Sequence, residues 1–509
     1  MSDSPDVRRR RVALVRQLAA RIPHPVAVME LAAVIESIGI NDAVASEDYG
    51  CSDVFELAER LFPLVVRSSE VNRSRAAVSS RTSVQSDDDR ERFSWATASS
   101  RGLLALAPLA FLVATIEILS QAGWKTGSVL ALSLGASTAV LVASGPIFAA
   151  SRRTAIYLGF GYRAPARRFL SLMSLGTLGV CSVIAGAAFA AANLLGYFDD
   201  RQRLTFALSL MGFALLWLVV SSLTLTGSAV VAMAVLAVGL ASGVAAGFVW
   251  GAVTGLGVGY GLSTAVLFLA WVAGDLRSVS WPLPLPAFGP LLVEAVPYAK
   301  FGFLFSFLLL EPHVMAWLGR TNGSRINALT TLELSLTLGL PPLLLVAGFH
   351  EHGMRSFWRS ARQLEALSDR SGFRTALVDL FRRRLTRYGI ALVTFSTLWA
   401  VGIEIAHQLG TFKPLSQVVF LSGIAGFCLV GLAQFNCLFL LGLARPAGAL
   451  AATYSGIVAL AVVGIPLAFV NFRLPIVGFA VGAAVFAAVG FGWCRKALGS
   501  ADHLYATAF

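Results

Sequence analysis

Apolar residues occur in long runs between Gly102 and Trp493, and short polar segments separate the runs. About 20 apolar residues are enough for an α-helix to cross the hydrocarbon core of a bilayer. The alternating strands of a membrane β-barrel, roughly ten residues each, are not seen. The pattern predicts an all-α polytopic membrane protein with about 12 transmembrane helices in two six-helix halves. We expect spans at residues 102–122, 128–150, 169–195, 204–225, 228–248, 252–273, 290–319, 327–349, 389–409, 415–442, 447–470 and 474–494.

The boundaries are least distinct between residues 204 and 274, a stretch that has no Lys, Arg, Asp or Glu. Its length fits three spans joined by tight Gly/Ser turns. The predicted organisation of the membrane part is a first half at 96–274, a cytoplasmic connection at 275–289, a second half at 290–496 and a cytoplasmic tail at 497–509.

The first 95 residues differ from the rest in composition. Helical periodicity predicts a basic amphipathic helix over Val7–Ile22 and another helix over Pro25–Ile38. A third helix is expected over Asp53–Phe62, with Ser52 as its cap and Pro63 as its end. We therefore predict a small helical cytoplasmic N-terminal unit at residues 1–67. The following residues, 68–95, are polar and Ser-rich, which is typical of a flexible linker.

Lys and Arg are distributed unevenly between the two sides of the predicted membrane. With a cytoplasmic N-terminus, the inward segments carry 18 of these residues and the outward segments carry 7. The positive-inside rule then places both termini in the cytoplasm of a protein of the cell membrane. A basic inward loop follows the second span of each half, which suggests two repeats related by an axis along the membrane normal. Within the longer loop, Met354–Leu367 and Phe373–Arg387 are expected to form amphipathic helices at the interface.

Composition narrows the classes of protein further. Only 13% of the residues are charged, against about 25% in an average soluble domain. The net charge of +12 is explained by cytoplasmic loops rather than by nucleic-acid binding. The five cysteines include no CxxC pair, and no phosphate-binding GxxxxGK[ST] motif occurs. The sequence predicts no metal site, no cofactor and no Walker-type ATPase, and GLGVGYG at 255–261 favours close helix packing.

Ionisable residues inside apolar spans are the candidate functional residues, because burying a charge in a bilayer is costly. The segment Val293–Gly319 has the most of them and is predicted to form one wall of a transport cavity. An interface position, a structural pair and a role in binding an ion or substrate remain alternatives for the acidic and histidine side chains. The predicted substrate or ion pathway comprises Lys300, Glu311, His313, Glu333, Glu404 and His407, with Arg152 and Arg153 as a cytoplasmic basic entrance.

Two stretches carry a family resemblance. One is Ala143–Tyr162, with Ser-Gly-Pro near the end of the second span, and the other is Tyr298–Trp317, which is rich in aromatic residues and ends in Trp. With the 6+6 layout, these stretches resemble the Pel exopolysaccharide transporter family. That family belongs to the multidrug/oligosaccharidyl-lipid/polysaccharide exporter (MOP) superfamily. The resemblance implies a membrane transporter that works by alternating access beside polysaccharide-assembly proteins.

Several functions are compatible with these features. The first is export or flipping of a polysaccharide or lipid-linked glycan, and the second is multidrug or small-solute antiport by the same fold. A polytopic glycosyl- or acyltransferase is disfavoured, because the outward loops are short and the largest inward loop is dominated by arginines; we expect no catalytic residues. The expected partners are the glycan substrate, membrane lipids and assembly proteins that dock on residues 1–67.

Overall fold

The structure is a computed structural model of the whole chain. It describes residues 5–21, 28–79, 126–159, 163–195, 199–225, 229–250, 252–276, 288–318, 339, 341–343, 346, 370–409, 416–471 and 473–499. The chain divides into two compact units, Met1–Phe93 and Ser94–Phe509. Each unit is described by itself below.

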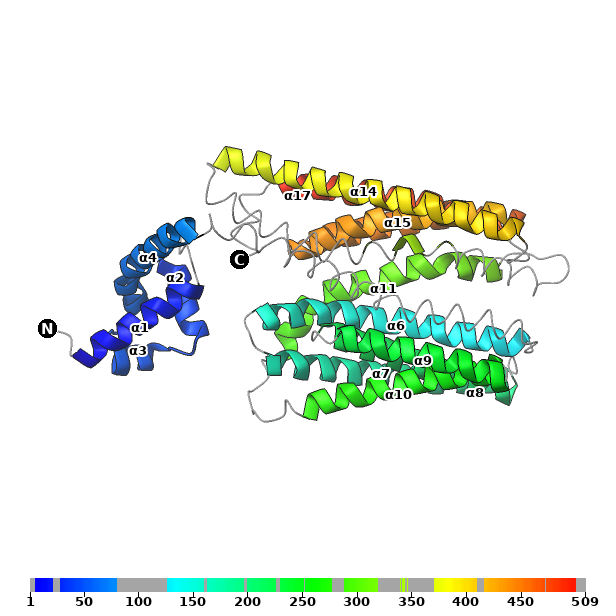
Figure 1. The fold of residues 1–509 in the computed structure, drawn as a ribbon, viewed down its shortest axis with the longest axis horizontal. Helices are drawn as coiled ribbons and strands as arrows, with labels where there is room; N and C mark the ends of the chain where they lie inside the picture. The colour runs from blue at the N-terminus through cyan, green and yellow to red at the C-terminus, as the bar shows by residue number, and fades with distance from the viewer. Residues whose placement is uncertain are drawn as a thin grey trace. The chain divides into compact units, whose positions relative to one another are not determined.

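The N-terminal unit is helical, as its periodicity predicts. Its apolar stripes bury against one another in a core of their own. Leu18, Leu31, Ile35, Leu57 and Leu61 are all completely buried in this core. The helices are α1 (Pro5–Arg21), α2 (Val28–Ser37), α3 (Asp42–Tyr49) and α4 (Val54–Ser79) (Figure 1).

Helix α3 was not predicted, because its eight residues have almost no apolar periodicity. Its end signals are nevertheless present in the sequence. The side chain of Asn41 accepts a hydrogen bond from the backbone N–H of Val44 at 3.0 Å, and Gly50 ends the helix with φ of 62°. Such N-caps and left-handed glycine ends are common helix boundaries. An N-cap residue at 41 and a glycine at 50 mark the two ends of a short helix and would have identified it.

Helix α4 corrects two expectations. The predicted third helix was to end at Pro63, but α4 continues to Ser79, through the first part of the segment expected to be a linker. Leu61 and Val65 are fully buried, and their packing holds the helix on both sides of Pro63. Beyond Pro63 no proline or glycine interrupts the sequence before Ser79. The rest of the predicted linker lies outside the described residues.

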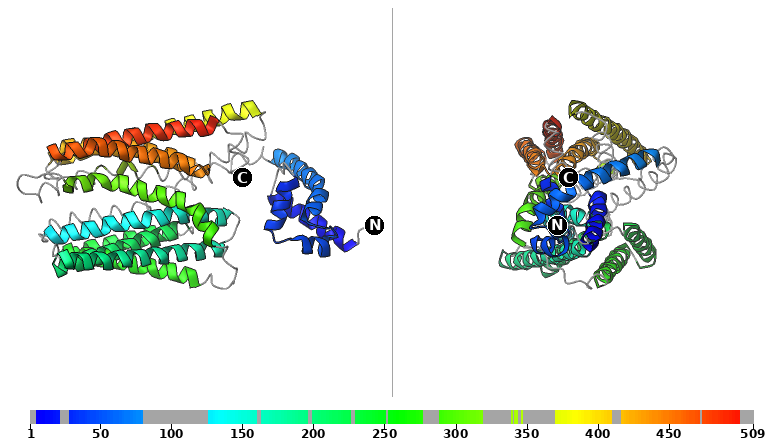
Figure 2. Two further views of the ribbon diagram at one scale, coloured as in Figure 1. Left: turned by 180° about the vertical axis from the view of Figure 1, so that it is seen from behind. Right: turned by 90° about the vertical axis from the view of Figure 1, so that its left-hand side faces the viewer.

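The membrane unit consists of long helices that run nearly along a common direction (Figures 1 and 2). Ten of the twelve expected spans coincide with described helices. The expected spans 102–122 and 327–349 lie wholly or mostly outside the described residues. Three separate helices occupy residues 200–276, which confirms the division predicted for that uncharged region. The helices are α6 (Thr126–Gly159), α7 (Arg163–Leu195), α8 (Asp200–Leu225), α9 (Ala229–Trp250), α10 (Ala252–Leu276), α11 (Phe288–Leu318), α14 (Arg370–Gln408), α15 (Gln417–Gly442), α16 (Pro446–Val470) and α17 (Pro475–Gly499).

Eight of the described helices are long and apolar enough to cross a membrane. Helices α9 and α10 contain shorter apolar segments, at Ala234–Gly243 and Gly257–Ala273. Close packing was predicted for the glycine-rich sequence in α10, and it is found at Gly259. A Cβ at Gly259 would lie 3.0 Å from the carbonyl oxygen of Gly239 in α9. The helix backbones therefore approach one another directly, as small residues permit in membrane proteins.

Helix α14 corrects the prediction of a separate interfacial helix at Phe373–Arg387. These residues form the first part of a continuous helix of 39 residues that runs into the membrane span. Their apolar stripe packs on neighbouring helices instead of lying in the lipid interface. Leu377, Phe381 and Tyr388 are buried on this stripe. The expected helix at Met354–Leu367 lies outside the described residues.

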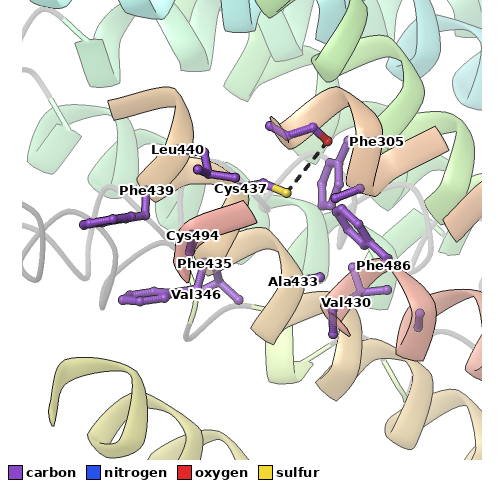
Figure 3. Close-up of a cluster of buried hydrophobic side chains, with 14 of the residues drawn as sticks. Phe305, Val346, Val430, Ala433, Phe435, Cys437, Phe439, Leu440, Phe486 and Cys494 are labelled. Atoms are coloured by element: carbon purple, nitrogen blue, oxygen red, sulfur yellow. Dashed lines mark hydrogen bonds between the residues drawn. The ribbon is translucent and has the colours of Figure 1, made fainter. Parts of the chain in front are cut away.

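Helix α11 lies between two groups of helices (Figures 1 and 2). It packs on α6 of the first half and on α16 and α17 of the second half. The largest buried cluster belongs to the second half and includes Phe305 of α11, Phe439 of α15 and Phe486 of α17 (Figure 3). Within it, the Cys437 thiol donates to the carbonyl oxygen of Ala449 at 3.9 Å. Aromatic packing thus ties α11 to the second half.

Candidate functional site

The candidate site is the contact between α6 and α11, the helices that contain the two stretches of the family resemblance. The helices are antiparallel, because residues later in α6 meet residues earlier in α11. The hydroxyl of Ser306 donates to the hydroxyl oxygen of Ser144 at 2.6 Å, and both side chains are buried. The Ser144 hydroxyl donates in turn to the carbonyl oxygen of Val140 at 2.5 Å. This short relay of hydrogen bonds joins the two halves of the membrane unit.

Two glycines bring the helices close together. A Cβ at Gly302 would lie 2.6 Å from the carbonyl oxygen of Ser144 and 2.7 Å from Cδ2 of Phe148. A Cβ at Gly145 would lie 3.0 Å from the carbonyl oxygen of Ala299. No side chain fits at Gly302 unless the helices separate, since real Cβ atoms do not approach other atoms so closely. The α6–α11 contact is therefore a close backbone-to-backbone interface.

A chain of aromatic rings continues from this contact into the second half. The ring of Phe148 in α6 meets that of Phe301 edge-on, with centroids 5.4 Å apart. Phe301 stacks with Phe305 at 5.9 Å, and Phe305 lies 6.4 Å from Phe486 of α17. Because rings at these separations contact each other directly, a movement of α11 disturbs packing in both halves.

Charged groups close one end of the α6–α11 contact. The Nη1 of Arg153 lies 2.9 Å from the Oε2 of Glu294, with 26% and 67% of the respective side chains exposed. The guanidinium of Arg152 lies over the ring of Tyr298, 5.9 Å from its centroid. That of Arg153 lies 5.8 Å from the centroid of Tyr157. Both arginines of the predicted basic entrance thus contact aromatic or acidic side chains at this end.

Glu311 lies on α11 toward the opposite end of the helix. It is only 4% exposed, and its Oε2 has no hydrogen-bond partner among the described residues. Leu308, one turn earlier, would lie 3.2 Å from a Cβ at Gly456 of α16. In the described part of the chain, Glu311 is the only Asp, Glu, Lys or Arg side chain that is fully buried. Burial of a carboxyl group in such surroundings is costly, because the group loses its hydration there.

Lys300 belongs to the predicted substrate or ion pathway, and that role stays a prediction. Its side chain is exposed, on the same stripe of α11 as Val293 and Phe303. Eleven residues separate it from Glu311 along the helix, a rise of about 16 Å at 1.5 Å per residue. The buried faces of α11 are occupied by Gly302, Phe305 and their neighbours. Lys300 and Glu311 therefore do not form a pair.

Glu404 and His407 lie in the last turns of α14, where both are partly buried. The Oε1 of Glu404 accepts hydrogen bonds from the side-chain amides of Gln408 at 3.3 Å and of Gln417 at 3.1 Å. The bond to Gln417 connects the end of α14 to the start of α15. This placement near a helix end fits the alternative of an interface position. His313 lies in α11, but its side chain is outside the described set, as is the whole of Glu333.

Neither the Ser144–Ser306 pair nor the Arg153–Glu294 pair was predicted from the sequence. Glu294, an acidic residue near the start of α11, is the partner of Arg153. The small residues Ser144, Gly145 and Gly302 were the available signal, because small side chains are typical of close helix contacts in membranes. Nothing in the sequence, however, indicated which of the twelve spans would meet.

No protein-family model matches the sequence, and no curated protein matches it. Solved transporter structures share its architecture. The crystal structure of MATE in complex with MaD5 is 17% identical, with a TM-score of 0.57, over 81% of this chain and 96% of that one. A multidrug resistance MATE family transporter of the MOP superfamily, in an outward-facing conformation, is 14% identical with a TM-score of 0.52, over 81% and 96%. A MOP superfamily transporter from Pyrococcus furiosus is 16% identical with a TM-score of 0.54, over 81% and 96%.

At these identities the likeness establishes the fold. The chain is an all-α, multi-pass membrane protein with the fold of the MATE transporters of the MOP superfamily. The fold agrees with the superfamily indicated by the sequence resemblance. The narrower resemblance to the Pel family stays a prediction.

Proposed function

We propose that this protein is a transporter that exports or flips a polysaccharide or lipid-linked glycan across the cytoplasmic membrane by alternating access. The observation that carries this proposal is the position of α11, which packs on α6 in one half and on α16 and α17 in the other. Alternating access in two-repeat transporters proceeds by rocking of one half against the other around a central site. A helix held by both halves is the element that such rocking must displace.

The choice of a glycan rests on the resemblance to the Pel family. Its two stretches, Ala143–Tyr162 and Tyr298–Trp317, contain the Ser144–Ser306 hydrogen bond and the Phe148–Phe301 contact. The two stretches are therefore neighbours in the fold as well as signals in the sequence. In this proposal Arg152 and Arg153 guide an anionic carrier toward the site. Such a carrier would compete with Glu294 for the guanidinium of Arg153.

A disulfide across the α6–α11 contact tests whether the two helices separate during transport. Ser144→Cys with Ser306→Cys replaces the two hydroxyls that lie 2.6 Å apart. Oxidation is expected to abolish glycan export in cells, and reduction is expected to restore it. The matched controls are the two single cysteine variants under the same oxidant. Full export by the oxidised, demonstrably cross-linked double variant would show that this contact stays closed through the transport cycle.

Within the proposed pathway, Glu311 is the residue to test first, followed by Lys300, His313 and Glu333. The Oε2 of its buried carboxyl has no hydrogen-bond partner among the described residues. Glu311→Gln is nearly isosteric and carries no charge. We expect unchanged abundance in the membrane and at least tenfold lower export. Lys300→Gln is the comparison, and undiminished export in both variants would contradict the cavity assignment.

Multidrug or small-solute antiport is the second candidate. It is favoured by the outward-facing neighbour, which is a multidrug resistance transporter with the same fold. Efflux of a cationic dye from cells that lack their own pumps separates the two functions. Dye efflux that depends on Glu311, together with normal glycan export in a deletion strain, would replace the glycan proposal.

For the N-terminal unit we propose docking of polysaccharide-assembly proteins. The unit buries its own apolar core, so it is expected to fold when expressed alone. Its exposed apolar side chains include Met29 at 69% and Phe55 at 50%. Pull-down with the isolated unit tests this, with Met29→Ser/Phe55→Ser as a variant that spares the core. Capture of assembly proteins that is equally strong with this variant would exclude these side chains as the contact.

A further inference from the structure

Six cationic side chains lie at one end of the second-half helices, and all six are exposed. They come from three separate segments of the chain, and together they are called the basic belt here. Its members are Arg382, Arg383 and Arg387 of α14, Arg445 at the start of α16, and Arg495 and Lys496 of α17.

Side-chain contacts to α15 show that the cations of α14 and those of α17 lie at one level. Tyr388 of α14 stacks on Phe435 of α15 with centroids 4.8 Å apart, and Phe381 lies 4.5 Å from Phe439. The Cys494 thiol of α17 donates to the carbonyl oxygen of Asn436 at 3.3 Å. Residues 381–388, 435–439 and 494 therefore share a level along the helix axes. The arginines of α14 lie among these contacts, as do the cations of α17.

The packing of α14 fixes the direction of its arginines. Leu377, Phe381, Tyr388 and Leu392 follow one another at spacings of four or seven residues, which keeps them on one face of the helix, and all are buried. The arginines lie outside this stripe and remain exposed. Because α14 continues without a break into its span, the arginines belong to a rigid helix and not to a loop.

The level of the belt matches the headgroup region of a bilayer. Apart from Val378, which is 38% exposed, the large exposed apolar side chains of α14 lie between Ile390, which is 63% exposed, and Ile405, which is 53% exposed. Arg387 and Arg383 come three and seven residues before Ile390, about 4 and 10 Å farther along the helix. The polar layer on each side of the hydrocarbon core is roughly 5–8 Å deep. Arginine side chains are long enough to place their guanidinium groups among lipid phosphates there.

The charge around the belt is strongly one-sided. Between residues 370 and 499 the sequence has only two acidic residues, Asp379 and Glu404. Glu404 lies near the other end of α14, so Asp379 alone offsets the belt within these residues. Lys496 also lies over the ring of Trp493, 5.0 Å from its centroid, and tryptophan is enriched at membrane interfaces. We propose that the basic belt binds the headgroups of anionic phospholipids and so surrounds the second half with them.

The test uses the purified full chain in nanodiscs that contain phosphatidylglycerol and phosphatidylcholine in equal amounts. Native mass spectrometry then counts the lipids that stay bound. Wild-type protein is expected to retain phosphatidylglycerol preferentially. Each basic residue near an anionic surface contributes about 1 kcal/mol, or about fivefold. Arg383→Gln/Arg387→Gln should therefore lower the preference about thirtyfold, while Arg383→Lys/Arg387→Lys should keep it.

The matched control is Arg201→Gln/Arg473→Gln, which removes two exposed arginines from the opposite end of the helices. This control is expected to keep the wild-type preference. The proposal is overturned if Arg383→Gln/Arg387→Gln retains as much phosphatidylglycerol as wild type, or if the control loses as much as that variant. Loss of the preference in wild-type protein on addition of millimolar inorganic phosphate would also overturn it, because the belt would then bind a soluble anion.

Discussion

The membrane unit contains two arginine-rich segments that look alike in the sequence and differ in the fold. Arg152 and Arg153 end the span in α6, and Arg382 and Arg383 precede the span in α14. In the structure the first pair contacts Tyr298 and Glu294 of α11. The second pair is exposed on the face opposite the buried stripe of α14. The same residue type therefore joins two halves of the protein at one place and faces the surroundings at the other.

The difference arises from the neighbouring helices. At α6 small residues let α11 approach closely, so the side chains that follow are brought onto acidic and aromatic groups. At α14 the buried stripe consists of large side chains that pack on α15 and α17, and the arginines project away from them. Four sets of substitutions test this contrast, and the set with the largest expected effect comes first.

Glycine-to-alanine substitutions should give the largest difference in stability between the α6–α11 contact and α14. Gly302→Ala places a Cβ 2.6 Å from the carbonyl oxygen of Ser144, so we expect a loss of about 1–3 kcal/mol of stability, typical of overpacking. Gly402→Ala in α14 has no atom within 4 Å of its Cβ and should be neutral or stabilising by up to about 1 kcal/mol. Thermal unfolding in detergent measures both. Equal melting temperatures of the Gly302→Ala and Gly402→Ala variants would show that the α6–α11 contact is looser than described.

Substitution of an arginine should likewise lower stability more at the α6–α11 contact than on α14. Arg153→Gln removes the ion pair with Glu294 and the contact with Tyr157. A loss of about 0.5–1 kcal/mol is expected, because the pair is partly exposed and screened by solvent. Arg383→Gln should change stability by less than about 0.5 kcal/mol, as exposed substitutions usually do. A larger loss for Arg383→Gln than for Arg153→Gln would reverse the comparison.

Exchange of the Arg153 and Glu294 side chains tests the ion pair itself. In Arg153→Glu/Glu294→Arg the attraction is restored with opposite orientation, so the double variant should recover part of what each single variant loses. The coupling free energy is expected to be a few tenths of a kcal/mol, and it should decrease as salt is raised. A double-mutant cycle at low and high NaCl measures it. Zero coupling at low salt would mean that the pair does not contribute to joining α6 and α11.

The serine pair should have an effect of a similar small size. Ser306→Ala removes the donor to Ser144, whose own hydroxyl still donates to the carbonyl oxygen of Val140. Hydrogen bonds between membrane helices contribute about 0.6 kcal/mol on average, so a loss of this size is expected. Ser144→Ala and the double variant complete the cycle by the same unfolding assay. Strictly additive losses would argue against a bond between the two hydroxyls.

Much of the fold could be predicted from the sequence. Long apolar runs located ten helices now described, including the three within residues 200–276, because crossing a bilayer demands length and low polarity. The ends of elements were less predictable. Phe373–Arg387 was expected to be separate from its span, yet Leu377 and Phe381 hold it in one helix with that span. Amphipathic periodicity identified the buried stripe but not what covers it.

The candidate site was less predictable than the fold. The sequence singled out α11 because its apolar span holds several ionisable groups, and its role in the site stays a prediction. It did not distinguish Lys300, which is exposed, from Glu311, which is buried. In a helix that is apolar on every side, periodicity does not show which face meets lipid and which meets protein, because both are equally apolar.

The sequence by itself determined that this chain is a helical membrane protein, where most of its spans lie, and which residues are costly to bury. Those properties follow from the local balance of apolar and charged groups, which any bilayer imposes. Only the tertiary structure decided that α6 meets α11, that Arg153 pairs with Glu294, and that the arginines of α14 face outward. These outcomes depend on the shapes of side chains far apart in the chain, such as Gly302 against Phe148, and shape complementarity is a property of the packed pair.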